Sequence, residues 1–145
     1  MSTSTHGFSL IEVALVLALC SFLATLGLYA SIKSLGRSSL QGEAATLTAL
    51  LTKARANAMS NIDALPWGVC VVGSQYILFS GASYAAHDHE EALEKTAAVT
   101  GIDCASGGLV FEQLSGSTAD TNILVTFNSE TAVININHAG RITTN

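Results

Sequence analysis

The chain carries a long apolar run near its start, and that run holds one charged residue. From Phe8 to Ile32 the only charged side chain is that of Glu12, and a polar segment, Met1–His6, precedes the run. A carboxylate in hydrocarbon costs about 2.5–3.5 kcal/mol on insertion scales, so such a group needs a partner or a route to water. The question that this sequence raises first is therefore what neutralises Glu12.

The apolar run predicts a helix that crosses a membrane. As a helix, Val13–Ile32 would extend about 30 Å, which is the thickness of the hydrocarbon layer. A secretory signal peptide is not indicated, because no basic residue precedes the run and the small residue Gly7 comes before it.

The helix is predicted to continue well beyond this span, from Phe8 to Asn61, with Pro66 preventing any further extension. An apolar stripe at steps of four and three marks its later half, and Glu43 falls on another face. The stripe consists of Leu40, Ala44, Leu47, Leu51, Ala54 and Ala58. We expect the first half of the helix to lie in lipid and the second half to pack on a head domain.

The remainder of the chain predicts a β-rich head. Runs of β-branched, aromatic and alternating residues indicate strands, and Gly, Ser and Asn between them indicate turns. The expected strands are Trp67–Val72, Tyr76–Ser80, Leu109–Leu114, Ile123–Asn128 and Ala132–Asn137, with a short edge at Arg141–Thr143. The acidic stretch Ala85–Val99 fits either a short helix or a long loop.

The predicted fold class is therefore α+β: a long N-terminal transmembrane helix packed on a small antiparallel β-sheet head. Its expected segments are a leader (1–7), the membrane half of the helix (8–32), the amphipathic half (33–61) and the head (62–145).

Charge argues against a nucleic-acid partner. The chain of 145 residues has a formal net charge of −5. Beyond Asn61 the only basic residues are Lys95 and Arg141, against nine acidic ones, which gives that part a formal charge near −7. Such a surface repels phosphates.

No residue pattern indicates catalysis or a cofactor. Phosphate-binding glycine loops, Cys-x-x-Cys pairs and nucleophile motifs are missing from the sequence. The segment 87–91, His-Asp-His-Glu-Glu, holds metal-ligand residue types, but a solvated acidic loop is the preferred interpretation. We expect no enzyme, no metal and no cofactor.

The three cysteines have different settings. Cys20 lies in the apolar run and is expected to be a small packing residue. Cys70 and Cys104 could form a disulfide in an oxidising compartment, which would close a loop of about 34 residues and add about 2–4 kcal/mol of stability. Two free thiols are the alternative, and the sequence does not decide between them.

The segment Gly7-Phe8-Ser9-Leu10-Ile11-Glu12, followed by an apolar helix, closely resembles the leader junction of type IV pilins and type II secretion pseudopilins. The rest of the chain looks like the GspH/FimT group of minor pilins and pseudopilins, through looser motifs. These are Lys53-Ala54-Arg55-Ala56-Asn57-Ala58, Trp67-Gly68-Val69 and the closing Ile134-Asn135-Ile136-Asn137-His138-Ala139-Gly140-Arg141-Ile142.

The resemblance implies a route of processing and assembly. A prepilin peptidase would cut between Gly7 and Phe8, and the new amino group of Phe8 would be N-methylated. Glu12 would then pair with the Phe8 ammonium of a neighbouring subunit, which removes the cost of an unpaired carboxylate. The alternative is that Glu12 merely extends to the membrane interface.

The implied function is that of a structural minor pilin or pseudopilin, at the initiation or the tip of a type II secretion pseudopilus or a type IV pilus. The implied partners are other pilin or pseudopilin subunits, prepilin peptidase, an inner-membrane assembly platform and the lipid bilayer. The implied location is the bacterial inner membrane, with a single pass and the head outside the cytoplasm, followed by the filament.

Two features depart from the family pattern. The usual basic residue before the cleavage site is missing, while Lys33 and Arg37 follow the apolar run, which by the positive-inside rule alone favours the opposite orientation. The junction motif nonetheless leads us to expect the head outside.

Two alternative functions stay open. Some FimT-like minor pilins take up DNA through a Gly-Arg-x-Arg motif, but here Gly140-Arg141-Ile142-Thr143 lacks the second arginine, so Arg141 is a weak DNA-binding candidate. A second alternative is an anchored envelope binding module, which would retain Met1–Gly7.

Overall fold

The structure is a computed structural model that describes the backbone of residues 9–145 and the side chains of residues 9–25 and 37–145. Two compact units divide the chain, Met1–Leu35 and Gly36–Asn145. The predicted leader and Phe8 lie outside the described residues. Helix α1 (Leu10–Met59) contributes its earlier part to the first unit and its later part to the second.

Helix α1 has the start and the end that local chemistry favours. The carbonyl oxygen of Ser9 accepts hydrogen bonds from the backbone N–H groups of Glu12 (3.0 Å) and Val13 (3.2 Å). The acidic Glu12 in the first turn suits the positive end of the helix dipole. Beyond Met59, Asn61 and Asp63 have φ angles of 56° and 59°, which break the helical path before Pro66.

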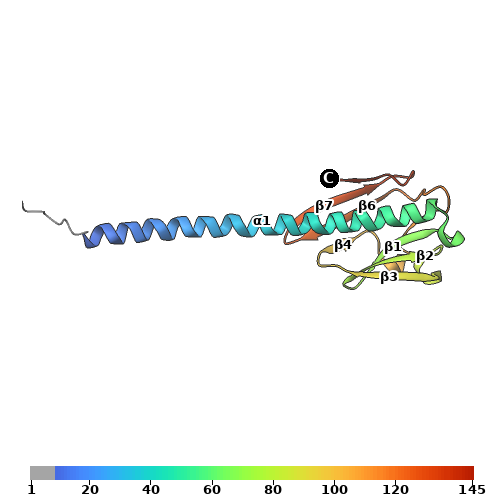
Figure 1. Ribbon diagram of the computed structural model, residues 1–145, viewed down its shortest axis with the longest axis horizontal. Coiled ribbons are helices and arrows are strands. Elements are labelled where there is room, and N and C mark those ends of the chain that lie inside the picture. Colours follow the sequence, from blue (N-terminus) through green and yellow to red (C-terminus); the bar gives the residue numbers. More distant parts are fainter. Residues whose placement is uncertain (1–8) are drawn as a thin grey trace, which may run out of the picture. The chain divides into compact units, whose positions relative to one another are not determined.

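The second unit contains two antiparallel sheets of four strands each (Figure 1). The first has the order β3-β2-β1-β5, with β1 (Trp67–Val72), β2 (Gln75–Ser80), β3 (His89–Glu94) and β5 (Leu109–Phe111). The second has the order β4-β6-β7-β8, with β4 (Ala98–Thr100), β6 (Thr121–Phe127), β7 (Glu130–Ile136) and β8 (Ile142–Thr144). This unit also contains three short 3-10 helices: η1 (Ile62–Ala64), η2 (Tyr84–Ala86) and η3 (Cys104–Ser106).

The apolar stripe of α1 lies in the core of this unit, as its spacing predicted. All six stripe residues are buried, and Leu47, Leu51, Ala54 and Ala58 have no exposed surface at all. They share one core with residues of both sheets, among them Tyr76, Phe111, Ile123 and Ile134. The later part of α1 therefore holds the two sheets together.

A smaller cluster covers the other face of the first sheet. It contains Ile77, Phe79 and a disulfide between Cys70 and Cys104, whose Cα atoms are 4.9 Å apart. Because this sheet is covered on both faces, residues Trp67–Cys70 of β1 are buried without the alternation of a half-exposed strand.

Glu43 is buried, although its position in the stripe pattern predicted another face of the helix. Its side chain is only 8% exposed. Its Oε1 atom accepts hydrogen bonds from the backbone N–H of Thr96, from the hydroxyl of Thr96 (2.9 Å) and from the backbone N–H of Ala97 (3.1 Å). Glu43 thereby fastens to α1 the short linker that carries the chain from β3 in one sheet to β4 in the other.

Tyr76 on β2 is also buried, and the negative charge of Glu43 acts on it. Its side chain is fully buried, and burial, together with the negative charge of Glu43, raises the pKa of its hydroxyl well above the usual value.

The head departs from the predicted single sheet and from the predicted course of residues 85–99. That stretch is neither a helix nor a loop, since it contains β3 and β4. Tertiary pairing overrides its weak strand propensity: β3 is fully exposed along its length, yet it pairs with β2 from His89 to Glu94.

The transmembrane part of the fold prediction is wrong. Among the residues that the structure describes, no helix is long and apolar enough to cross a membrane, which also overturns the predicted single pass through the inner membrane. A span needs about 20 consecutive apolar residues.

We expect Glu43→Ala to lower the free energy of unfolding by about 2–3 kcal/mol, because buried donors on Thr96 and Ala97 lose their acceptor. Urea denaturation of the full chain would measure the change. Glu94→Ala, on the exposed strand β3, is the matched control and should change the stability by less than about 0.5 kcal/mol. Equal effects of the two substitutions would contradict the role given to Glu43.

Candidate functional site

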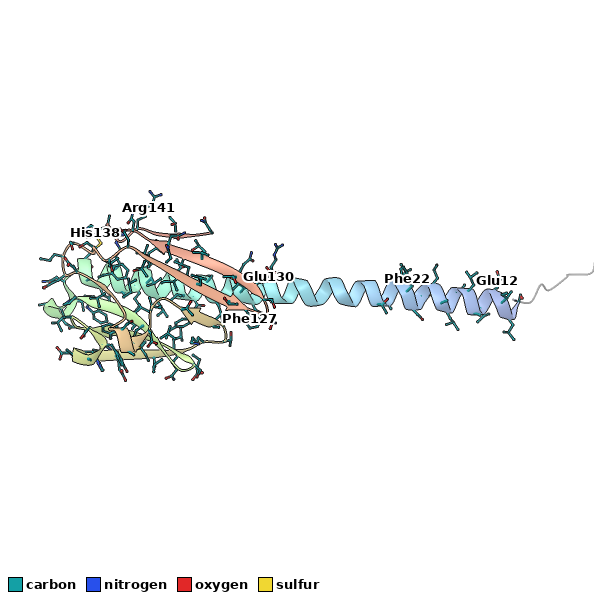
Figure 2. The ribbon with its side chains drawn as sticks, turned by 180° about the vertical axis from the view of Figure 1, so that it is seen from behind. Glu12, Phe22, Phe127, Glu130, His138 and Arg141 are labelled. Atoms are coloured by element: carbon teal, nitrogen blue, oxygen red, sulfur yellow. A yellow bond between two sulfur atoms is a disulfide. The ribbon has the colours of Figure 1, made fainter. Side chains whose placement is uncertain are left out.

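The earlier part of α1 exposes large apolar side chains on every side of the helix. Phe22 and Glu12 point away from it in Figure 2, and Phe22 is 63% exposed. The other exposed large side chains of this segment are Leu10, Ile11, Val13, Leu15, Val16, Leu17, Leu19 and Leu23. An exposed apolar surface of this extent marks an interaction site. We refer to Leu10–Thr25 as the apolar segment.

Glu12 is the only charged residue of the apolar segment. Its side chain is exposed and borders a hollow of about 290 Å³ that Val13, Val16 and Leu17 complete. The side chain of Glu12 is thus surrounded by apolar neighbours on the helix surface. The other two residues of the predicted assembly site, Gly7 and Phe8, lie outside the described residues.

The disulfide that the sequence left open joins β1 to η3. Asp103 caps η3, because its Oδ1 accepts a hydrogen bond from the backbone N–H of Ala105 (2.8 Å). Cys104 is thus held beside Cys70, both of them buried. Cys20, expected to be a packing residue, is instead exposed and unpaired within the apolar segment.

The acidic segment 87–91 forms pairs with its neighbours rather than a metal cluster. His87 Nε2 lies 3.3 Å from Glu90 Oε2, and Lys53 Nζ lies 2.6 Å from Glu91 Oε2. The ring of His87 stacks on Tyr84, with centroids 4.8 Å apart. Among the described residues no group of three or more His, Cys, Asp or Glu is placed to hold a metal ion.

Arg141 borders a polar hollow of about 390 Å³ on the second sheet, near His138 (Figure 2). The wall of this hollow also contains Asp120, Thr121, Asn122, Asn135, Ile136, Asn137 and Thr143. Arg141 is fixed through its backbone, whose N–H donates to Asn137 Oδ1 (2.9 Å). Because Asp120 shares the hollow, the site offers a phosphate no concentrated positive charge.

Arg55 has a structural role that the sequence analysis missed. Its Nη2 donates a hydrogen bond to the carbonyl oxygen of Ala139 (3.1 Å), so α1 is joined to the turn before β8. Gly140 lies directly against this arginine with a φ angle of 71°, and a Cβ atom there would overlap the carbonyl oxygen of Gly116. Two of the segments that carry the family resemblance, 53–58 and 134–142, are therefore in contact.

Comparison of the chain with family models, with curated proteins and with solved structures finds no match.

Two glycines should respond to alanine in opposite directions. Gly140→Ala should destabilise the chain by about 1–3 kcal/mol, because it adds backbone strain and a clash. Gly42→Ala, on an open face of α1, should stabilise it by about 0.5–1 kcal/mol through helix propensity. Thermal unfolding of both variants checks the pair, and a stabilising Gly140→Ala would contradict the described turn.

Proposed function

We propose that this chain is a structural subunit of a filament, of the minor pilin or pseudopilin type, that assembles through its apolar segment. The observation that carries the proposal is the set of exposed apolar side chains between Leu10 and Leu23, on every side of the helix. Other subunits with similar helices are the partners that fit this surface best, because leucine and valine side chains on two helices interdigitate when packed.

Burial of this surface supplies the driving force. Each large aliphatic side chain that leaves water contributes about 1.5–3 kcal/mol. The segment presents nine such residues, counting Phe22, with exposed fractions from 49% to 87%. Even partial burial between neighbouring helices would offset the loss of translational and rotational freedom on association, which costs about 4–15 kcal/mol.

Glu12 makes the assembly selective for neighbours that carry a cationic amine. Packing of the segment among apolar helices removes the carboxylate from water, and an unpaired charge there is strongly unfavourable. A cationic amine on the neighbouring subunit removes that penalty. Cleavage after Gly7 by a prepilin peptidase would create such an amine on Phe8, at the start of the same segment.

Different observations bear on the two alternatives, and the head bears on only one of them. Its hollow at Arg141 contains an acidic residue, which disfavours uptake of DNA. An envelope binding module needs no filament partner and would keep residues 1–7, so processing separates it from the proposed subunit. The pseudopilus and pilus versions of the proposal predict the same processing and the same contact at Glu12.

The intact mass of the mature chain tests the processing step. We expect the mass to show loss of residues 1–7 and a gain of about 14 Da from one methyl group. A Gly7→Val variant should keep the leader, because the small residue at the cleavage point is replaced. Native material that starts at Met1 would refute the proposed cleavage and favour the envelope binding module instead.

Substitution of Glu12 tests the assembly step. Glu12→Gln should reduce incorporation into filaments at least tenfold, which corresponds to about 1.4 kcal/mol. Sedimentation of sheared filaments followed by immunodetection measures the incorporated fraction.

Ser21→Ala is the control, since Ser21 belongs to the same segment and only bonds the carbonyl oxygen of Leu17 (2.8 Å). Filaments that form normally with Glu12→Gln would refute the pairing of Glu12.

A further inference from the structure

Strand β3 forms one edge of the first sheet, at its lower margin in Figure 1. It pairs with β2 over its whole length, from His89 to Glu94, and among the described residues no strand pairs with its other side. All six residues of β3 are exposed. The strand lies in the middle of the chain, between described segments on either side, so its open edge belongs to the fold of the head itself.

The register shows which main-chain groups face the open side of β3. The backbone N–H of Lys95, directly after the strand, donates a hydrogen bond to the carbonyl oxygen of Ser74 in the turn between β1 and β2 (2.9 Å). In an antiparallel pair, alternate residues direct their N–H and C=O groups to opposite sides. Lys95 and every second residue before it therefore face β2. The N–H and C=O groups of Glu94, Ala92 and Glu90 face the open side.

Two carboxylates stand on one face of this edge. Glu90 and Glu94 are four positions apart, which in a strand is about 13 Å. Glu90 accepts a hydrogen bond from the hydroxyl of Tyr84 and Glu94 accepts one from the amide of Gln75, both at 3.4 Å. Among the described residues, neither carboxylate forms an ion pair with a lysine or an arginine, whereas Glu91 on the other face is bonded to a lysine of α1.

We propose that the open edge of β3 binds an extended, basic segment of a partner protein, which joins the first sheet as a further antiparallel strand. The main chain of the added strand bonds the free N–H and C=O groups of Glu90, Ala92 and Glu94. The unpaired main-chain edge makes the site, and the charges select its occupant. Lysine or arginine side chains on the added strand complement the two carboxylates and speed the encounter.

The register also defines the sequence of the segment. Directly opposite residues of an antiparallel pair place their side chains on the same face. Basic residues therefore lie opposite Glu94 and Glu90, and a small or β-branched residue lies opposite Ala92. On the other face, the residue opposite Leu93 is apolar, because Leu93 is 43% exposed and pairing covers it. Because the added strand runs antiparallel, its order is basic, apolar, β-branched, polar, basic.

A second copy of this chain does not fit the edge. Its own β3 would bring carboxylates against carboxylates, and charges on an edge strand are a known means of preventing such pairing. Beyond Asn61 the only basic residues are Lys95 and Arg141, so no strand of the head has two cations four positions apart.

The helix of a second copy does not fit either. Lys33 and Arg37 are four positions apart, but they belong to α1. Four residues of a helix rise only about 6 Å, and the main-chain groups of a helix are already bonded to one another. The occupant is therefore a different protein that presents a basic extended segment.

The test is titration of the full chain, in a nonionic detergent because of its apolar segment, with an end-blocked, rhodamine-labelled peptide, Ser-Lys-Val-Thr-Thr-Lys-Ser, followed by fluorescence anisotropy. We expect saturable binding that weakens at least about fivefold when NaCl is raised from about 0.05 M to about 0.5 M, because salt screens exposed charges. The peptide Ser-Lys-Val-Pro-Thr-Lys-Ser should bind at least about tenfold more weakly, because proline opposite Ala92 lacks the donor N–H.

Charge reversal identifies the surface that binds. The double variant Glu90→Lys with Glu94→Lys should lose the basic peptide and instead bind Ser-Glu-Val-Thr-Thr-Glu-Ser. The matched control is Glu112→Lys with Glu130→Lys, which makes the same change in net charge at exposed positions outside β3. This control should keep the affinity for the basic peptide within about twofold, because distant exposed charges are screened.

Ala92→Pro removes a donor from the open edge without taking a bond from the ladder with β2, and should weaken binding at least about tenfold. Ala92→Val keeps that donor and should bind like the unchanged chain. Thermal unfolding of each variant shows that the head still folds. Three results would overturn the proposal: no saturable binding of the basic peptide, equal effects of the two double variants, or a folded Ala92→Pro variant that binds the peptide as tightly as Ala92→Val does.

Discussion

Leu47, Leu51, Ala54 and Ala58 occupy a single stripe of α1, and side chains from both sheets enclose them completely. The two sheets share no strand, so the helix is the element that makes one core of them. Small residues at two of the four positions let the strands approach the helix closely. Loss of this packing would leave each four-stranded sheet with an uncovered apolar face, which is unfavourable in water.

Polar contacts then fix where the connections between the sheets run. Glu43 holds the link from β3 to β4, and Arg55 holds the turn that precedes β8. Both residues lie on α1 next to the buried stripe, so one helix sets the position of the core and of the crossing points. A buried carboxylate such as Glu43 is tolerated because it accepts hydrogen bonds from Thr96 and Ala97. Hydrophobic packing and the polar contacts therefore depend on each other.

The sequence predicted the elements that obey strong local rules. The stripe from Leu40 to Ala58 has a clear helical period, and β1 was located to the residue because Trp67–Val72 is a dense apolar run. Prediction from the sequence failed where strand pairing, and not local propensity, determines the structure. The segment His89–Glu94 has little strand propensity and becomes a strand only because β2 offers an edge.

The candidate sites show the same limit. Glu12 and Arg141 were identified from the residues themselves, whereas the burial of Glu43 depends on Thr96 and Ala97, more than fifty positions away. No local sequence pattern predicts such a contact. The disulfide was open for the same reason, since 34 positions separate Cys70 from Cys104 and only the fold brings them within bonding distance.

The apolar segment sets a requirement of its own on any partner that covers it. Its side chains are exposed to between 49% and 87%, and this surface is unfavourable in water whatever covers it. Glu12 makes protein a better cover than a uniform apolar medium, because only a partner of defined structure can place a cation against one carboxylate at one position.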